Sequence, residues 1–548
     1  MLNRIPASIF WTGLWFVLVA VSLFVRPPLP VDETRYLAVA WDMWLRHDFL
    51  VPYLNGEPYS HKPPLLFWLM HLGWAIFGVN DVTPRLVAPL FGLACLFLTR
   101  SLARDLWPDD RRVHDMAPLI LLGCGFWTLF STLTMFDLIL AFWTLLGLRG
   151  VLLAWRQGSV CGFAMLGFAI GLGALTKGPA ILLHILPVAL LAPLWAGQLV
   201  PENLKTAKPL RSWRWWYFGV FLSVVFGVVI GLAWAIPAGI AGGEVYRDAI
   251  LWGQTAGRMV KSFAHQRPFW WYVAVLPGLL VPWLIWPPLW RALWRLRSSW
   301  RADGGLRLGL IWFVAAFFIF SLISGKQLHY LLPEFPALAL ILAFALCNQV
   351  PSGVAFWDRA LPAMLAVGLG GFIILVPVLH VIPREPFWLP LLNNQWGALL
   401  IAVGLWIFFA RFDGVVDQAQ IVKIVLVPVT IVVTVHLAAA PVLKAAYDLQ
   451  PVSQQLKIWQ DEGIALANFG KYHGQYQFMG RLTKPMAIVG RKQGDVAAFL
   501  ARNPNGRVVA YYKTVPTDAK PLVQYHFRSR TIVVWDSKTL QTHPNLRN

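Results

Sequence analysis

The chain has 548 residues, of which 58% are hydrophobic and 13% charged, and its mean hydropathy is +0.59. Soluble globular proteins carry about 25% charged residues, so this composition excludes a soluble globular protein, and the high apolar content excludes a disordered one. The formal charge is +20, yet the basic residues occupy short gaps between apolar runs. This distribution indicates loops held on the cytoplasmic side of a membrane and argues against a nucleic-acid partner.

Thirteen apolar segments are read as membrane spans, since a bilayer core requires roughly 20 apolar residues per helix. The first, 8–25, follows Arg4 and precedes no small-residue cleavage site, so we expect an uncleaved signal anchor with the N-terminus inside. The other spans are expected at 82–104, 116–134, 138–155, 160–176, 179–195, 215–237, 269–290, 308–324, 330–350, 361–379, 396–410 and 421–440.

The charge pattern supports this topology. The even-numbered loops, which would be cytoplasmic, carry the basic clusters, among them Arg100, Arg104, Arg111, Arg112, Lys205, Lys208, Arg291, Arg295 and Arg301. The positive-inside rule requires this bias, and an odd number of spans then places the C-terminus outside.

Three long segments are expected on the outer side. They are the loops 26–81 and 238–268 and a tail from 444 onward. Within the first loop, 36–45 and 64–78 are predicted to be short helices that lie in the membrane interface.

The tail differs in composition from the rest of the chain. Short apolar runs occur at 485–489, 507–512 and 531–535, with a helix-like segment at 496–502. This pattern predicts a small soluble α/β domain of about 100 residues. The expected fold is therefore an all-α polytopic membrane domain, 1–443, followed by an α/β domain, 444–548.

Acidic residues mark the expected outer face. Asp32 and Glu33 directly follow the first span, and Asp137 lies between the third and fourth spans with almost no loop. Carboxylates so close to lipid are costly unless they are hydrated or used, which favours a general base or a group that orients an acceptor. The alternatives are a solvated loop start for the first pair and a helix cap for Asp137. Arg35 could pair with them or bind a phosphate.

Basic residues are expected on the same face. Pro63 and Pro64 hold Lys62 in an extended conformation, and a held lysine suits a phosphate. His61 has no second ligand at metal-site spacing. Further candidates on this face are Tyr59, Lys177, Arg258, Lys261, His265, Arg267, Lys326 and Tyr330. Any one of these lysines could simply extend its amine to the interface, but together the residues indicate an anionic substrate at the membrane surface.

No nucleotide or common hydrolase motif is present. The sequence lacks GxxxxGK[ST], GxGxxG after a strand, HExxH and GxSxG. An activated substrate carried on a lipid would remove the need for nucleotide energy. Two alternatives stay open, a transporter or flippase of lipid-linked sugars and an assembly protein that handles the same lipids. A transporter would place charges near span centres, whereas these candidates cluster at span ends.

The order of these residues resembles a known family. The Asp32-Glu33 pair, then Tyr59 and Lys62-Pro63-Pro64, then Asp137, and then Gly325-Lys326 through Pro333 are similar to the GT-C integral-membrane glycosyltransferases. The aminoarabinose lipid A transferases, which are related to protein O-mannosyltransferases, are the branch they resemble. The segment Leu175-Thr176-Lys177-Gly178-Pro179 is also similar to that branch.

The resemblance implies an activity. A sugar would move, with inversion, from undecaprenyl phosphate to lipid A or to another glycan or protein acceptor, at the periplasmic face of a bacterial inner membrane. Asp32 and Asp137 match the family's acidic residues. Lys62, Tyr59, Tyr330 and Arg258 match positions around the lipid phosphate.

One position departs from the family pattern. The aminoarabinose transferases carry Glu before the motif lysine, and this chain has His61. That Glu is associated in the family with a metal, so the resemblance leaves both a divalent metal and the amino-sugar specificity open.

Overall fold

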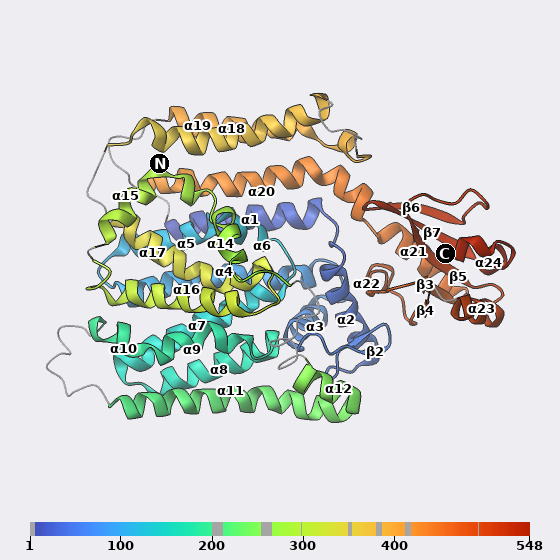
Figure 1. The fold of residues 1–548 in the computed structure, drawn as a ribbon, viewed down its shortest axis with the longest axis horizontal. Coiled ribbons are helices and arrows are strands. Elements are labelled where there is room, and N and C mark those ends of the chain that lie inside the picture. Colours follow the sequence, from blue (N-terminus) through green and yellow to red (C-terminus); the bar gives the residue numbers. More distant parts are fainter. Residues whose placement is uncertain are drawn as a thin grey trace.

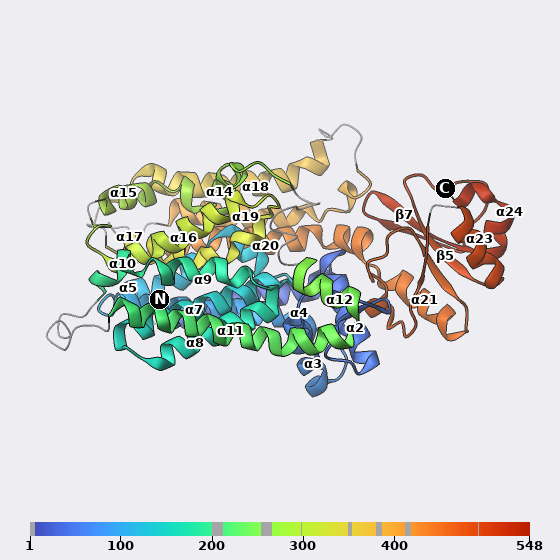
Figure 2. The same ribbon diagram turned by 60° about the horizontal axis from the view of Figure 1, so that its bottom comes forward.

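Long apolar helices run side by side through most of the chain (Figure 1). The structure is a computed structural model, and it describes residues 6–199, 212–253, 266–297, 299–348, 353–379, 386–410, 418–490 and 493–547. Two views place a small sheet domain beyond one end of the helical bundle (Figures 1 and 2). We call this end the domain end and the opposite one the far end.

Nine helices of the described residues are long and apolar enough to cross a membrane. They are α1 (Ala7–Val25), α4 (Thr83–Leu106), α7 (Phe136–Gln157), α8 (Val160–Lys177), α11 (Trp213–Ala241), α16 (Gly304–Leu322), η6 with α17 (Leu328–Glu334 and Phe335–Cys347), α18 (Phe356–Leu379) and α20 (Gln418–Tyr447). This content indicates a multi-pass membrane protein.

The other four expected spans are short or broken helices. They are α5 with α6 (Arg111–Leu122 and Gly125–Phe130), α9 with α10 (Ala180–Leu190 and Ala192–Trp195), α14, η5 and α15 (Trp271–Leu279, Trp283–Ile285 and Pro287–Leu296), and α19 (Gly397–Phe409). Proline, which lacks an amide proton, accounts for two of the breaks, at Pro193 and around Pro282. Helix length thus establishes nine of the thirteen expected spans, and the full count stays a prediction.

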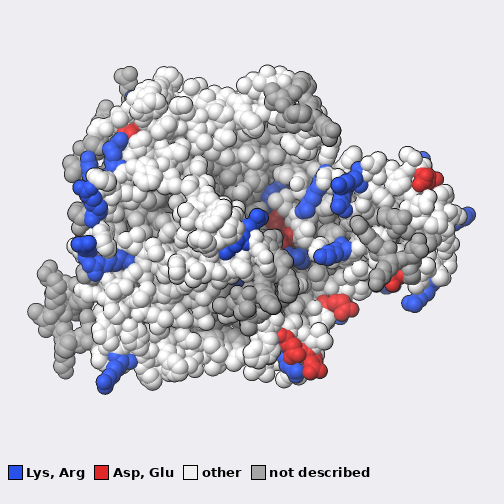
Figure 3. Space-filling model, viewed as in Figure 1, with Lys and Arg blue, Asp and Glu red and all other residues white. Residues whose placement is uncertain are grey.

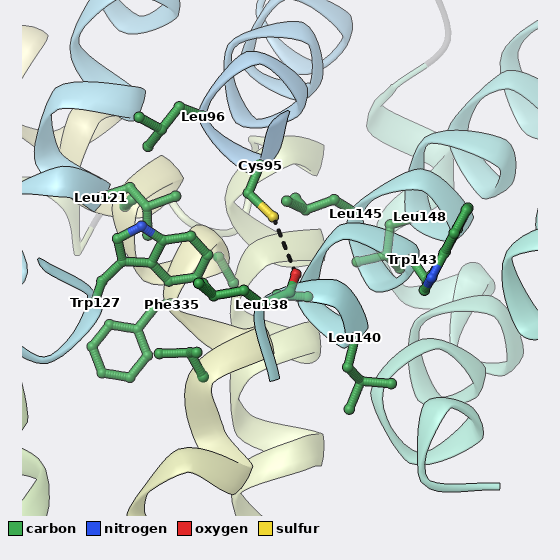
Figure 4. Packing of buried hydrophobic residues seen from close by; sticks show 14 of the residues in the cluster. Cys95, Leu96, Leu121, Trp127, Leu138, Leu140, Trp143, Leu145, Leu148 and Phe335 are labelled. Atoms are coloured by element: carbon green, nitrogen blue, oxygen red, sulfur yellow. Dashed lines mark hydrogen bonds between the residues drawn. The ribbon is translucent and has the colours of Figure 1, made fainter. Parts of the chain in front are cut away.

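Close packing holds the bundle together. Figure 4 shows Cys95 of α4 pointing toward Leu138 of α7, and its thiol donates to the Leu138 carbonyl over 3.7 Å. Between α7 and α8 the backbones nearly touch, because a Cβ added at Gly162 would lie 2.3 Å from the Ala154 nitrogen. Small residues permit this approach where lipid supplies no hydrophobic drive for helix association.

Residues 26–81, the first loop that we expect on the outer side, form a compact layer at the domain end. It contains α2 (Asp32–Arg46), the paired strands β1 (Tyr53–Leu54) and β2 (Glu57–Pro58), and α3 (Leu65–Phe77). Helices are therefore present at both positions where interfacial helices were predicted, and their place in the membrane interface stays a prediction. Shorter elements elsewhere are η2 (Ala196–Gln198), α12 (Glu244–Asp248), the π-helix η4 (Ala249–Gly253), η7 (Leu389–Leu391) and η8 (Asn394–Trp396).

The C-terminal domain is a mixed five-stranded sheet in the order β4-β3-β5-β7-β6, with β3 parallel to β4 and β5 and the remaining pairs antiparallel. Its strands are β3 (Leu466–Phe469), β4 (Ala487–Val489), β5 (Arg507–Tyr512), β6 (Val523–Phe527) and β7 (Arg530–Asp536). Its helices are α21 (Gln450–Asp461), α22 (Gln477–Gly480), α23 (Gln493–Arg502), α24 (Ser537–Thr542) and η9 (Pro544–Arg547).

The predicted fold class, a helical membrane domain with a small α/β domain, is confirmed. The runs predicted at 485–489, 507–512 and 531–535 match β4, β5 and β7, whereas β3 and β6 were not predicted. The expected boundary at 444 falls within the last turn of α20, which ends at Tyr447.

Candidate active site

Charged side chains of both signs meet at the domain end of the bundle. Figure 3 shows them at the junction with the C-terminal domain, while basic side chains predominate along the far end. The predicted acidic and basic candidates that the structure describes belong to the start of α2, the loop before α3, the start of α7 and the η6 segment.

Glu33 is surrounded by donors. Arg26 makes two contacts with its carboxylate, at 2.5 and 3.0 Å, and the backbone amides of Leu29 and Thr134 donate to it at 2.7 and 2.8 Å. Burial raises the pKa of Glu33, but Arg26 and the other donors outweigh burial and lower it to about 2. Each oxygen has two donors, so this geometry favours a role in positioning α2 against the segment before α7 over the catalytic role expected from the sequence.

Asp32 has the opposite environment. Its side chain is 51% exposed, it pairs with Arg35, and the Tyr36 hydroxyl donates to it at 3.4 Å. Burial raises the pKa of Tyr36 well above its ordinary value, and the Asp32 carboxylate adds to this, so Tyr36 stays protonated and can donate. Successive helical residues point about 100° apart, which turns Asp32 to the open side while Glu33 faces the core.

Asp137 is buried in the first turn of α7. Lys177, at the last turn of α8, donates to its Oδ1 at 2.5 Å, and the same ammonium lies 4.7 Å from the centre of the Tyr330 ring. A carboxylate at a helix N-terminus and a cation at a C-terminus both complement the helix dipoles. The structure thus joins three elements that the sequence separates widely.

Phe136, the residue before Asp137, connects the two acidic positions. The rings of Tyr36 and Phe67 lie edge-on to it, with centroids at 4.9 and 5.8 Å, and the Lys62 ammonium lies 5.3 Å from its centre. Lys62 consequently interacts electrostatically with Asp137. The predicted lysine and the predicted carboxylate belong to one site.

Aromatic and histidine side chains complete this arrangement. Tyr59 is buried and lies edge-on to the exposed His61 at 5.3 Å, and it interacts electrostatically with Arg35. His329, beside Tyr330, interacts with Asp32 and Asp137 and was not predicted as a site residue. The sequence signal that could have identified His329 is its position just before an expected span, in the motif that contains Lys326.

Lys326 lies apart from this group. Its ammonium is buried and donates to the carbonyl oxygens of Ile323 and Arg267 at 2.5 and 3.1 Å. These contacts fix the link between α16 and η6, which favours a positioning role over the expected contact with phosphate. Arg258 and His265, two other candidates, lie outside the described residues, as does Lys261.

The C-terminal domain also reaches the site. The Trp41 indole of α2 donates to the Leu482 carbonyl at 2.8 Å, and a Cβ added at Gly474 would lie 2.9 Å from the Ala38 side chain. His473 in the same loop interacts electrostatically with Arg35 and Asp32. Burial lowers the pKa of His473, and Arg35 lowers it further, so the ring is neutral at neutral pH.

The described side chains do not form a metal site. Among the residues described, no group of three His, Cys, Asp or Glu side chains could hold a metal ion. His61 is exposed and packs on Tyr59. The set of donors among the described residues does not fit a divalent metal, and the proposed sugar transfer includes no metal-dependent step.

Several known proteins are similar to this chain in sequence. Residues 61–207 match the profile of the dolichyl-phosphate-mannose-protein mannosyltransferase family. Among curated proteins, the chain is 30% identical over 421 residues to an undecaprenyl phosphate-alpha-4-amino-4-deoxy-L-arabinose arabinosyl transferase of Edwardsiella ictaluri, covering 73% of this chain and 72% of the relative. It is 29% identical over 406 residues to the protein of that name from Pseudomonas aeruginosa, covering 70% of each chain.

A solved structure shares the fold. The crystal structure of ArnT from Cupriavidus metallidurans bound to undecaprenyl phosphate superposes with a TM-score of 0.75, at 20% identity, over 96% of this chain and 97% of that one. Its apo form superposes with a TM-score of 0.74. Because nearly the whole chain is covered, the likeness in fold includes the C-terminal domain.

Proposed function

The chain belongs to the family of undecaprenyl phosphate-aminoarabinose arabinosyl transferases, and from this premise we propose that it moves a sugar from undecaprenyl phosphate to lipid A or a related acceptor. The enzyme is a polyprenyl-phosphate-sugar-dependent glycosyltransferase. The family name supports 4-amino-4-deoxy-L-arabinose as the first sugar to test.

The observation that carries this proposal is the meeting of Lys62 and Lys177 at Asp137, with His329 interacting with both Asp137 and Asp32. Lys62 and Lys177 both interact electrostatically with the buried Asp137, which brings two ammonium groups to one place and suits an anion there. We assign the part of the site with Lys62 and Lys177 to the donor phosphate. Its negative charge grows as the bond from the anomeric carbon to the phosphate oxygen breaks, and the two ammonium groups stabilise that charge.

The acceptor belongs on the opposite side, at Asp32. Asp32 is half-exposed, whereas Asp137 is buried behind Lys177. When the acceptor is a hydroxyl group, Asp32 takes its proton as the oxygen attacks the anomeric carbon from the face opposite the phosphate, which inverts that centre. When the acceptor is a phosphate it is already ionised, and Asp32 with Arg35 only orients it.

The C-terminal domain contributes to this acceptor side. His473 lies near Asp32 and Arg35, with the exposed Lys471 two residues before it. A cation and a neutral imidazole suit the anionic head group of a glycolipid. We therefore assign the loop with Lys471 and His473 to the acceptor.

We propose that the domain end faces the periplasm of a bacterial inner membrane. Support comes from the basic residues of the far end, which the positive-inside rule assigns to the cytoplasm. A flippase of lipid-linked sugars, the alternative class, would require charged groups near span centres, whereas these site residues lie at helix ends.

Mass spectrometry of lipid A and of polyprenyl phosphates, from cells with and without the gene, tests the proposal. Loss of a pentose-sized addition on lipid A, restored by the wild-type gene and not by Asp32→Asn, is the expected result. Accumulation of sugar-loaded carrier with unchanged lipid A would replace lipid A by a protein or polysaccharide acceptor. If neither lipid changes, the transferase proposal fails.

A further inference from the structure

A cavity of about 380 Å³ lies at the far end of the bundle, away from the active site. It sits between the last turns of α4 and the first turns of α5 and is open to the surface. Its volume is within the range of small-molecule sites, about 300–1,000 Å³. The lining side chains that matter here are Phe97, Arg100, Ser101, Arg104, Arg111 and His114.

The charges of this cavity are unbalanced. Arg100 pairs with Asp115 through contacts at 2.8 and 3.0 Å. Across the part of the chain that the structure describes, no carboxylate forms an ion pair with Arg104 or Arg111. The cavity thus has two arginines in excess, and the planar guanidinium groups suit the oxygens of a phosphate.

Two acidic residues near the cavity have partners outside it. Asp105 pairs with Arg149 at 3.2 Å, and Asp110 caps α5 through the amide of Val113 at 3.3 Å. Asp110 also accepts from the Asn348 side chain at 3.0 Å. Among the described residues, neither carboxylate forms an ion pair with Arg104 or Arg111, and Asp109, the exposed acidic residue beside the lining Pro108, forms none with them either.

The cavity is apolar toward the bilayer and basic toward water. Phe97, Arg100, Ser101 and Arg104 follow helical spacing and share one face of α4. Phe97 is 49% exposed and packs edge-on against Trp11 of α1, with ring centroids 4.6 Å apart. The seven helical steps from Phe97 to Arg104 cover about 10 Å, which is enough to reach from the hydrocarbon core of the bilayer to its head groups. A free anion in water would gain nothing from the apolar wall.

We propose that this cavity binds the phosphate group of an anionic phospholipid in the leaflet at the far end of the bundle. Arg104 and Arg111 contact the phosphate oxygens, and Phe97 packs against the first methylenes of the acyl chains. Basic pockets between membrane helices bind anionic lipid head groups in this way. The site is independent of the sugar-transfer reaction, since it uses no residue assigned to that reaction.

Binding of phosphatidylglycerol to the full-length purified protein tests this proposal, by native mass spectrometry and by the shift in Tm in detergent. We expect phosphatidylglycerol to bind and raise Tm, and phosphatidylcholine to do neither. The double variant Arg104→Gln with Arg111→Gln should bind phosphatidylglycerol at least tenfold more weakly. The matched control, Arg112→Gln with Arg214→Gln, removes two exposed arginines of the same end that do not line the cavity and should bind normally.

Three results would overturn the proposal. Equal loss of binding in the control would reduce the effect to general surface charge. Equal binding of phosphatidylcholine would remove the role of the anionic head group. Inorganic phosphate that binds as tightly as the lipid would make the cavity a site for a free anion. Native mass spectrometry reads the bound lipid directly, so a lowered Tm of the variant does not obscure the outcome.

Discussion

Two acidic regions at the domain end are held in opposite ways. At the turn from α1 to α2, Glu33 has two donors on each oxygen and is closed off from solvent. Beside it, Asp32 is half-exposed and pairs with the long side chain of Arg35. A carboxylate that satisfies four donors is committed to the fold, whereas the half-exposed Asp32, held by Arg35 and by a long contact of 3.4 Å from the Tyr36 hydroxyl, can exchange these partners for substrate. Of these two adjacent acidic residues, Glu33 thus serves the stability of the fold and Asp32 is available for the reaction.

The largest expected effect is on stability, at Glu33. Glu33→Gln replaces one oxygen by an amide nitrogen that donates and cannot accept, and it leaves the Arg26 guanidinium buried without its counter-charge. Removing one partner of a buried pair costs about 3–5 kcal/mol. Detergent melting curves should show a large fall in Tm and a low yield of folded protein, with near-normal activity per folded molecule. An unchanged Tm would mean that Arg26 finds another partner.

Acid should destabilise the protein through the same residue. The pKa of Glu33 lies at about 2 in the fold against an ordinary value of 4.5, so its contribution is present above pH 4.5 and is lost as pH falls toward 2. At 1.36 kcal/mol per pKa unit this amounts to about 3 kcal/mol. Comparing Tm against pH for wild type and Glu33→Gln isolates the effect. Parallel curves over this range would contradict it.

Asp32→Asn should lower activity and leave stability unchanged, the reverse of Glu33→Gln. Transfer to a hydroxyl acceptor should fall by about 10²-fold or more, because general bases contribute about 10²–10⁴-fold. Tm should stay unchanged, since the side chain is half-exposed. Turnover assays with purified protein and sugar-loaded carrier give the first quantity and melting gives the second. A variant that loses stability and keeps its turnover would erase the distinction between the two carboxylates.

Two lysines extend the comparison to the donor side. Lys62→Met removes a cation near Asp137 and should raise the KM for the lipid-linked donor about tenfold, with Tm little changed, since the Lys62 side chain is only partly buried. Lys326→Met removes two contacts with backbone carbonyls and should lower Tm while the donor KM stays normal. The opposite outcome, with the donor KM changed only in Lys326→Met, would restore Lys326 as the phosphate ligand.

The smallest effect is expected at the loop of the C-terminal domain. Lys471→Ala and His473→Ala should each raise the acceptor KM about threefold, the worth of a weak exposed contact, and leave the donor KM unaltered. Lys538→Ala, on α24, serves as the matched control because it lies elsewhere in the same domain. Equal shifts in the KM of donor and acceptor would show that the loop acts on the fold and not on the acceptor.

Part of this picture was accessible from the sequence. Apolar run length predicted the helical bundle, and motif order brought Asp32, Lys62 and Asp137 to one face. The sequence could not separate Asp32 from Glu33, because the direction of each side chain depends on where α2 begins. It could not assign Lys326 either, since the carbonyls that hold it come from Ile323 and from Arg267 in another loop.

Pairings between distant segments were the least accessible. Lys177 meets Asp137 across 40 residues, and His473 approaches Asp32 from another domain. Neither contact has a local signature, because only the packing of α8 and of the sheet domain creates it. The helix breaks at Pro193 and around Pro282 were not predicted either, because a hydropathy average over about 20 residues does not register a single proline.

The docking of the two domains has a consequence for biosynthesis. The Asn55 side chain donates to the Met486 carbonyl and accepts from the Met486 amide and the Gln477 side chain, a connection across 431 residues of chain. At about 5–20 residues per second, a ribosome needs about 20–90 s to bridge that interval. During this time the α2 layer has emerged without its partner, and the Trp41 indole and the Asn55 amide have only water or lipid head groups. The α2 layer therefore acquires these contacts only after the last domain has been synthesised and has docked.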